Sequence, residues 1–176
     1  MRFTEQEIEI RIIDEDSLSA ARDFLLQQCR ELYGREFQSA KNQDIWNLQE
    51  VYLNTAGNIM LGAFLRGGNL VGTAAACAYN DRIAAVKGRY GLDTTAEIAR
   101  CYIDKTLRRR GIGSLLVQKV QEFCFKQGYR TLYLHTHKFL PGGFSFWQSQ
   151  GFAIVIEEYG PDETVHMEKC WQRFKK

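Results

Sequence analysis

The amino-acid sequence predicts a mixed α/β protein in which strands and helices are interleaved along the chain. Two observations indicate this class: the spacing of apolar residues switches repeatedly between a period of two and a helical period, and neither type of element is confined to one part of the chain. With 176 residues, 45% of them hydrophobic, the chain can bury one core without disulfides or a metal. Its two prolines, Pro141 and Pro161, mark no linker, so we expect a single domain over residues 1–176.

The N-terminal part is expected to contain one strand and two helices. Isoleucines alternate with polar residues over 8–12, which is typical of a strand. Asp16 or Ser17 then caps a helix that runs to about Tyr33, where a glycine follows and ends it. Apolar residues at helical spacing predict a second, shorter helix over 41–53.

The remaining chain switches between strand and helix patterns. An arginine, two glycines and an asparagine at 66–69 separate two apolar runs, which is typical of an antiparallel hairpin. The later apolar runs fall between glycines that end each element. The expected elements are strands over 59–65, 70–79 and 95–103, a helix from 111 or 113 to 126, a strand over 131–136, a short helix over 142–150, and strands over 152–157 and 164–171.

The net charge of +2 is too small to indicate a nucleic-acid partner, but the charge is unevenly distributed. Residues 1–60 carry 6 Lys and Arg against 11 Asp and Glu, whereas residues 61–176 carry 17 against 10. A basic C-terminal part favours an anionic ligand there, without indicating how large that ligand is.

The cysteines and the absence of targeting signals indicate a reduced, cytosolic protein. The five cysteines form no C-x-x-C pair, so a zinc site or a thioredoxin-like motif is not expected. The acidic N-terminal sequence lacks the apolar core of a signal peptide, and no apolar run approaches the roughly 18 residues that a membrane span needs. We therefore expect free thiols, mostly packed, and a cytoplasmic location without a membrane partner.

The segment 108–116, Arg-Arg-Arg-Gly-Ile-Gly-Ser-Leu-Leu, carries the clearest chemical signal. It follows a predicted strand and opens a predicted helix, whose first N–H groups lack internal partners and meet the positive end of the helix dipole. Gly111 and Gly113 allow a diphosphate to approach the backbone, and the arginines add positive charge. The spacing matches neither the dinucleotide-binding nor the P-loop fingerprint. The alternative is a basic turn whose glycines only permit the bend.

These residues also carry a family resemblance. Arg108-x-x-Gly111-x-Gly113, after the strand over 95–103, resembles motif A of the GNAT family of N-acetyltransferases. Leu134-His135-Thr136 resembles the strand that follows in this family, and residues 146–152, Phe-Trp-Gln-Ser-Gln-Gly-Phe, resemble its next helix and the Gly-Phe pair that ends it. Together with the hairpin, the four features occur in the family's order and span nearly the whole chain.

The resemblance implies the acyl-CoA N-acyltransferase fold, with a central, mostly antiparallel, splayed mixed sheet of six to seven strands and about four helices. It also implies acetyl-CoA as co-substrate. Main-chain groups of the strand before motif A would bind the pantetheine arm, and motif A would bind the diphosphate. The cofactor-binding residues carried over in this way are Cys101, Ile103, Arg108, Arg109, Arg110, Gly111, Ile112, Gly113, Ser114, Thr136 and Trp147.

The resemblance further implies that an amine is acetylated, and an alkylammonium must lose a proton before it can attack a thioester. Glu97 lies 14 residues before Gly111, where histone-acetylating members place a catalytic glutamate, and we expect it to act as the base directly or through water. By alternation it shares a strand face with Cys101 and Ile103. The alternative is an edge carboxylate paired with an arginine.

Trp147 occupies the position at which the family usually has a tyrosine that protonates the leaving thiolate. An indole N–H is not a useful acid, so Trp147 either lines the CoA site or packs in the core. His135 and His137 flank Thr136 and are expected to be solvated or to line a cleft, with a role as acid or base left open. No metal is expected, because no third ligand to this pair can be identified.

The residues and the resemblance therefore favour an acetyl-CoA-dependent N-acetyltransferase acting on a primary amine, either a small molecule or a peptide, by direct attack in a ternary complex. A non-catalytic or regulatory CoA-binding module is the alternative, and a nucleic-acid binder ranks last. A homodimer is compatible with the sequence. The acidic second helix, with Asp44, Trp46, Glu50 and Tyr52, resembles the region that forms an acceptor wall in the family, although a solvated helix face explains its charges equally well.

Overall fold

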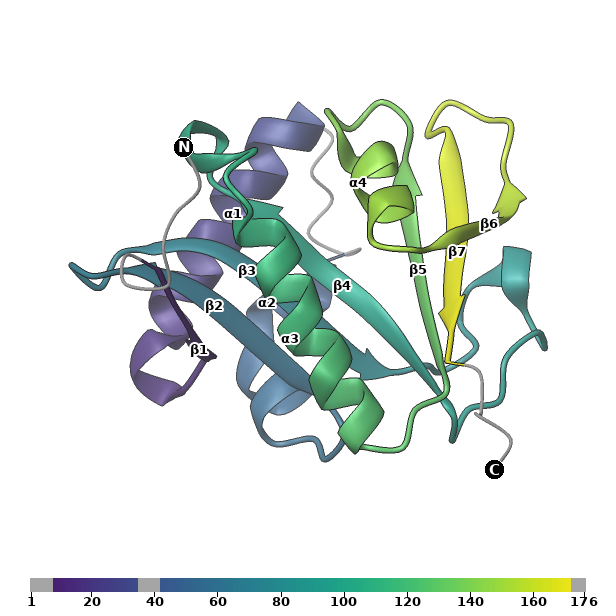
Figure 1. Cartoon of the computed structure of the whole chain (residues 1–176), viewed down its shortest axis with the longest axis horizontal. Helices are drawn as coiled ribbons and strands as arrows, with labels where there is room; N and C mark the ends of the chain where they lie inside the picture. The colour runs from purple at the N-terminus through teal and green to yellow at the C-terminus, as the bar shows by residue number, and fades with distance from the viewer. Residues whose placement is uncertain (1–7, 35–41, 172–176) are drawn as a thin grey trace. The chain divides into compact units, whose positions relative to one another are not determined.

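Seven strands form one sheet in the computed structural model, which describes residues 8–34 and 42–171 (Figure 1). The order is β1-β2-β3-β4-β5-β7-β6. The sheet is mixed, because β4 and β5 are parallel whereas β1–β2, β2–β3, β5–β7 and β6–β7 are antiparallel. The predicted fold class, a mixed sheet flanked by helices, is confirmed.

The elements follow the predicted ranges closely. Most boundaries lie within one or two residues of the expected ones, because glycines and polar turns end the periodic segments. In chain order they are β1 (Ile8–Ile12), η1 (Glu15–Ser17), α1 (Leu18–Tyr33), α2 (Gln43–Trp46), η4 (Gln49–Leu53), β2 (Ile59–Leu65), β3 (Leu70–Ala78), η5 (Ala84–Val86), β4 (Thr95–Ile103), η6 (Lys105–Leu107), α3 (Ile112–Lys126), β5 (Thr131–His137), α4 (Gly143–Ser149), β6 (Ala153–Glu157) and β7 (Thr164–Cys170).

The chain divides into two compact units, Met1–Cys77 with Ala99–Phe123, and Ala78–Ile98 with Cys124–Lys176. In the first unit, α1 and α3 cover opposite faces of the sheet (Figure 1). Met60 and Phe64 of β2 belong to the core that α1 closes. On the other side, Leu116 of α3 lies against Gly72 of β3, whose added Cβ would be 3.2 Å from Leu116 Cδ1. Burial on both faces explains why β2 and β3 are almost continuously apolar.

Ser17 is the N-cap residue of α1, as one of the two predicted positions, but it makes no side-chain cap bond to that helix; a capping box instead opens the short turn η1 directly before it. The Asp14 carboxylate accepts the N–H of Ser17 at 3.1 Å, and the Ser17 hydroxyl accepts the N–H of Asp14 at 2.9 Å. These bonds satisfy amides that the first turn leaves without partners. At the other end, Gly34 adopts a φ of 61°, so the predicted glycine stop is confirmed.

The single helix predicted over 41–53 is wrong in its continuity, and residue 41 lies outside the described residues. The helix ends after α2, because the Asn47 side chain donates to the Gln43 carbonyl at 2.9 Å and competes with the helical backbone. A π-helical turn, η4, follows. The predicted apolar spacing nevertheless holds, since Ile45, Leu48 and Tyr52 are all buried.

Strand β4 contains an extra residue at Arg100, which has a left-handed φ of 53°. The hydrogen bonds with the β3 side show it: Tyr79 N–H bonds to Thr95 C=O and Asp104 N–H to Val71 C=O, so the nine residues 71–79 face the ten residues 95–104. The Thr73 hydroxyl bonds to the Arg100 carbonyl at 2.8 Å. This is a β-bulge, which bends a strand and interrupts its alternation.

The bulge corrects the alternation argument for Glu97. Beyond it, Arg100 and Tyr102 point toward α1, where both contact Cys29, whereas Ile103 points toward the side of α3. The alternation of side chains between the two faces of β4 is shifted by the left-handed residue Arg100, which lies between Glu97 and Ile103. The prediction that these two residues share a face by uninterrupted alternation is therefore wrong in its premise.

In the second unit, β5 separates two environments. Thr136 faces α4, since its hydroxyl is 3.4 Å from where a Cβ on Gly143 would lie. Tyr133 and His135 lie on the opposite face by alternation. There Tyr133 packs against Tyr79 and Tyr90, with ring centroids 5.4 and 5.3 Å away. The polar site described below lies on this second face.

Candidate functional site

The segment between β4 and α3, in the first unit, is ordered by its own hydrogen bonds. The Asp104 carboxylate accepts from the backbone N–H and the hydroxyl of Thr106, at 2.8 and 2.6 Å. These bonds and the charges of Lys105 and Arg108 lower the pKa of Asp104, against the opposing effect of burial. The Arg108 side chain turns back and donates from Nε to the Ile103 carbonyl at 3.0 Å. Residues 104–108 thus form a hydrogen-bonded turn between the end of β4 and the start of α3.

Gly111 is the residue from which α3 starts. Its carbonyl accepts the Leu115 N–H at 3.0 Å, so the next amides are the first of the helix. An added Cβ would meet no atom within 4 Å, whereas the φ of 91° is left-handed. Glycine is therefore required here by the backbone conformation rather than by space. Arg109 and Arg110 beside it are exposed, as a side-chain contribution to anion binding requires.

Cys101 lies in β4, the strand before this turn, and its thiol is not reactive. Burial raises its pKa to about 12, so the thiolate is not populated at neutral pH. A role for this residue through its backbone stays a prediction. The Ile103 carbonyl already accepts the Arg108 bond, although a carbonyl oxygen has a second lone pair.

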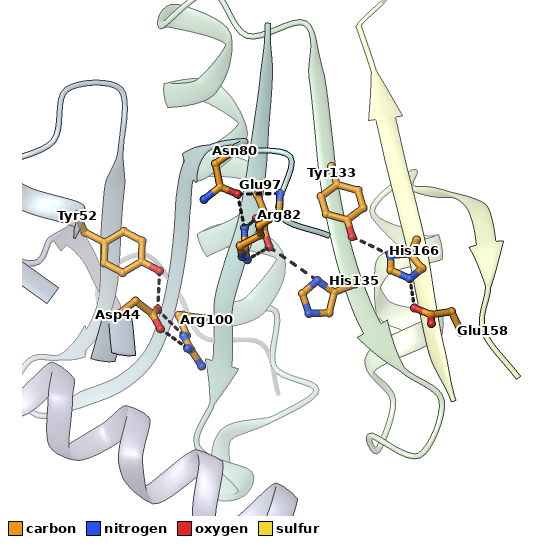
Figure 2. A network of polar contacts seen from close by, with 10 residues as sticks. All are labelled: Asp44, Tyr52, Asn80, Arg82, Glu97, Arg100, Tyr133, His135, Glu158 and His166. Atoms are coloured by element: carbon orange, nitrogen blue, oxygen red, sulfur yellow. Dashed lines mark hydrogen bonds and ion pairs between the residues drawn. The ribbon is translucent and has the colours of Figure 1, made fainter. Parts of the chain in front are cut away.

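Glu97, in the second unit, is held by Arg82. The Arg82 Nη1 and Nη2 atoms donate to Oε2 and Oε1 of Glu97 at 2.5 and 2.8 Å, a bidentate pair (Figure 2). Only 2% of the Glu97 side chain is exposed, against 48% for Arg82. Asn80 accepts from Arg82 Nη1 at 3.1 Å and steadies the guanidinium. The alternative interpretation of Glu97 expected a carboxylate at a sheet edge, paired with an arginine. An arginine is indeed the partner, but the carboxylate is buried and β4 is not an edge strand.

His135 is the second neighbour of Glu97, with Nδ1 3.8 Å from Oε1 (Figure 2). Its side chain is 36% exposed, and the remainder is enclosed by protein. That enclosure lowers the pKa of His135 to about 4, while Glu97 acts in the opposite direction and the nearby His137 and His166 act with it. The imidazole is therefore neutral at pH 7.

A buried relay runs beside this site. The Tyr133 hydroxyl lies 2.7 Å from His166 Nδ1, and His166 Nε2 lies 2.6 Å from Glu158 Oε1 (Figure 2). A carboxylate accepts hydrogen bonds, so His166 donates from Nε2 to Glu158, and its Nδ1 shares a hydrogen bond with the Tyr133 hydroxyl. Tyr133 and His166 are buried whereas Glu158 is half exposed, so the relay links the tyrosine cluster to the surface.

Thr136 and Trp147, the predicted cofactor-binding residues that lie in the second unit, are packed inside it. Thr136 is buried and pairs with Val165 of β7. Trp147, 7% exposed, lies in α4 with its ring 5.0 Å from Phe146 and 5.4 Å from Phe152. Packing therefore accounts for the contacts of this tryptophan.

The expected acceptor wall is less acidic than its sequence indicates. Asp44 accepts from Arg100 at Nε and Nη2, and from the Tyr52 hydroxyl at 2.9 Å (Figure 2). Burial opposes the charge of Asp44, but the Arg100 bonds outweigh it and lower the pKa of this carboxyl. The charge is thus compensated within the first unit. Of the remaining residues, Trp46 is 49% exposed and Glu50 accepts from Asn54.

Sequence reasoning missed Arg82 and Arg100. Arg82 lies in a polar connection without periodicity, and only the folded path of that connection brings it to Glu97. Arg100 lies inside a strand pattern that carries no sign of a bulge. A charged residue in the middle of a mostly apolar strand was the available signal, because a charge there needs a partner. Among residues 8–34 and 42–171 no cluster of histidine, cysteine and carboxylate side chains has the arrangement of a metal site.

The mixed sheet, with β4 and β5 parallel and α3 between them in the chain, has the architecture of an α/β acyltransferase. The family comparison agrees: residues 26–152 match the model of the acetyltransferase (GNAT) family, and the chain belongs to this family. This confirms the resemblance seen in the sequence. None of the helices in the described part of the chain is long and apolar enough to cross a membrane.

Curated relatives are N-acetylaspartate synthetases. That of Danio rerio is 26% identical over 146 residues, which cover 80% of this chain and 48% of the relative. That of Homo sapiens is 28% identical over 113 residues, 64% of this chain and 33% of the relative. The chain thus spans half the length, or less, of the curated relatives it matches.

Solved structures show the same fold at low identity. A GNAT-family acetyltransferase from Staphylococcus aureus Mu50 has a TM-score of 0.76 at 18% identity, covering 93% of this chain and 98% of the other. The PaiA N-acetyltransferase from Thermoplasma acidophilum, solved in complex with coenzyme A, has a TM-score of 0.69 at 19% identity, covering 93% and 99%.

Proposed function

We propose that this protein is an N-acetyltransferase that moves the acetyl group of acetyl-CoA to a primary amine by direct attack in a ternary complex. The observation that carries the proposal is the turn into α3: a left-handed Gly111 opens the helix directly after a run of arginines. Helix N-termini of this kind bind phosphate groups through backbone N–H groups and the helix dipole. Membership of the GNAT family supports the same reaction class.

The residues present fit a CoA donor. The diphosphate would be bound by the segment 108–114, where Arg109, Arg110 and Ser114 are exposed. Main-chain groups of Cys101 and Ile103 would bind the pantetheine amides. Thr136 and Trp147, both buried, are proposed as further contacts. When bound, acetyl-CoA supplies the activated thioester.

The chemistry of the acceptor side is proposed to depend on Glu97. The amine nitrogen attacks the thioester carbonyl, the C–N bond forms and the C–S bond breaks, so the nitrogen must give up a proton. Glu97 lies at the last β4 position in the parallel register with β5, opposite Tyr133. Its burial and its bond to Arg82 fix the carboxylate in place. A thiolate with a pKa near about 8.5 leaves without strong acid assistance, which is compatible with tryptophan at position 147.

The acceptor is proposed to be a small amine, and an acidic amino acid is one candidate. The curated relatives are named for the synthesis of N-acetylaspartate. Compensation of Asp44 by Arg100 and of Glu97 by Arg82 weakens the case for a polycationic acceptor, because neither carboxylate presents an unbalanced negative charge. Aspartate therefore belongs in any acceptor panel beside polyamines, aminoglycosides and peptides.

One observation favours the alternative, a CoA-binding module without turnover. Trp147 packs against Phe146 and Phe152 and offers no acid in the place where the family usually has tyrosine. The presence of a fixed carboxylate at Glu97 argues for catalysis.

Two measurements separate the possibilities. Titration calorimetry with acetyl-CoA should show saturable binding that weakens with added salt, because arginines contribute. Release of free CoA should then be measured across an amine panel that includes aspartate. Binding with CoA release supports the enzyme, and binding without release from any amine supports the module. No binding at millimolar acetyl-CoA would contradict both.

A further inference from the structure

We propose that His135 takes the proton from the acceptor amine and that Glu97 is a positioning residue that acts through this imidazole. The inference rests on the proposed acetyl transfer and deepens it, since it replaces direct proton transfer to Glu97 by transfer to its neighbour. The two residues come from adjacent parallel strands of one compact unit, β4 and β5, so their spacing is set by the sheet.

Accessibility is the first argument. A base must reach the proton that it removes. Only 2% of the Glu97 side chain is exposed, and both of its oxygens already accept hydrogen bonds from Arg82. Of the two residues that contact this carboxylate, His135 is 36% exposed and Arg82 is 48% exposed. Arginine cannot accept a proton, so His135 is the accessible acceptor.

The orientation of the imidazole is the second argument. Nδ1 faces Glu97 Oε1 across 3.8 Å, a separation that can shorten when a positive charge appears on the ring. Because an ionised carboxylate only accepts hydrogen bonds, it favours the tautomer with the proton on Nδ1. The lone pair is then on Nε2. The same geometry places the imidazolium, once formed, beside a fixed negative charge, as in the histidine–carboxylate pairs of other enzymes.

The groups around His135 keep its lone pair available. Glu97 from β4 favours the protonated ring, whereas Arg82, His137 and His166 disfavour it, and Tyr133 packs beside it at a ring distance of 6.4 Å. Enclosure dominates and holds the pKa of His135 near about 4, so the ring is neutral at the pH at which acceptor amines are attacked. Arg82 has a defined part in this arrangement, because its positive charge acts against protonation of the ring.

The step balances as follows. The ammonium form of the acceptor first loses one proton to the medium. The neutral amine then attacks the acetyl carbonyl, the C–N bond forms, and an N–H proton passes to Nε2 of His135 as the C–S bond breaks. The imidazolium then returns its proton to the medium while the thiolate takes one up. Amine and thioester therefore give amide and thiol, and the neutral imidazole is restored.

The test compares His135→Ala with His137→Ala. His137 lies on the same strand face, with its Nδ1 2.8 Å from the Asp162 carbonyl, and serves as the matched control. With an amine that the wild-type protein acetylates, we expect His135→Ala to lower kcat about 100-fold or more with little change in the Kd for acetyl-CoA. Added imidazole should restore part of the rate in this variant and none in His137→Ala.

A second readout does not depend on turnover. Titration of the His135 ring protons by NMR should show a lower midpoint in Glu97→Gln than in the wild-type protein, because the carboxylate favours the protonated ring. Full activity of a folded His135→Ala protein, or an unchanged midpoint in Glu97→Gln, would overturn the inference. A wild-type protein that binds no acetyl-CoA or acetylates no amine would instead contradict the proposed function, so the two failures are distinguishable.

Discussion

Arg100 holds Asp44 through two hydrogen bonds, from Nε at 2.8 Å and from Nη2 at 2.5 Å, although its own backbone is left-handed. The bulge in β4 therefore has a structural consequence within the first unit. It directs a guanidinium toward α2, whereas Ile103 further along the strand faces the other side. The segment of α2 and η4, which does not form one continuous helix, is thereby bonded to the sheet through Asp44.

Asp44→Asn should lower the free energy of unfolding by about 2 kcal/mol, because it leaves a largely buried guanidinium without its charge partner. The two side chains are 13% and 24% exposed, which places the loss below that of a fully buried pair. Urea denaturation measures the change. Glu50→Gln in the same segment is the control, and its effect should stay within about 0.5 kcal/mol. Equal losses in both variants would show that the Arg100 bond adds no specific stability.

The same pair should leave a signature at acid pH. The folded-state pKa of Asp44 is below the ordinary value of 3.8, so its stabilisation is complete above 3.8 and is lost as the pH falls through the folded value. Unfolding free energies measured from pH 5 down to pH 2 should therefore fall less steeply in Asp44→Asn than in the wild-type protein. Parallel curves would contradict the assignment.

The lowered pKa of His135 should make the folding stability depend on pH in a second, higher pH range. Its pKa is about 4 when folded and 6.5 as a model value, so between these values the unfolded chain binds a proton that the folded protein does not. Stability should decrease as the pH falls from about 6.5 to about 4. In His135→Gln this part of the decrease should be absent, with the acid limb below pH 4 retained. The measurement is the urea midpoint at half-unit intervals, and an unchanged slope in the variant would exclude this histidine as its source.

The strands and helices could be predicted because their signals are local. The range predicted for β4 is the range observed, and α3 starts between the two glycines proposed as its start. Both elements combine strong periodicity with clear stop residues, and neither depends on a distant partner for its type. The segment 41–53 failed because one side chain, Asn47, competes with the backbone for a carbonyl.

The site could be predicted only in part, for a related reason. Glu97 and the 108–114 segment are proposed as site residues from motif spacing and the family resemblance that it carries, and their roles stay predictions. The contacts of Arg82 and Arg100 depend on the folded course of the chain. Arg82 reaches Glu97 because the irregular loop that contains it lies beside β4, and Arg100 points toward α2 because β4 has an extra residue there. A single sequence specifies which charges must find partners, but not which partners they find.

Gly72→Ala should destabilise the first unit by about 1–3 kcal/mol, because its β-carbon has no room. It would lie 2.7 Å from Ile103 Cδ1 and 3.2 Å from both Leu116 Cδ1 and the Tyr102 carbonyl oxygen, which cannot all move away. Gly67→Ala is the matched control, since its added carbon meets nothing within 4 Å. Thermal or urea denaturation compares the two variants. A loss in Gly67→Ala as large as that in Gly72→Ala would show that chain flexibility, and not space, decides the effect.

Gly111→Ala separates backbone strain from donor binding. Gly111 and Gly68 share a left-handed φ, of 91° and 83°, and an added Cβ meets no atom within 4 Å at either position. Alanine should therefore cost about 1–2 kcal/mol of stability at both sites, because the left-handed conformation is unfavourable for a residue with a Cβ. Only Gly111 precedes the first turn of α3, where the proposed diphosphate site depends on the direction of the backbone N–H groups. Titration calorimetry with acetyl-CoA should therefore show at least a tenfold weaker Kd, on the order of 1.4 kcal/mol, in Gly111→Ala and an unchanged Kd in Gly68→Ala. Equal affinities in both variants would mean that the donor is not bound at the start of α3, whatever the two alanines do to stability.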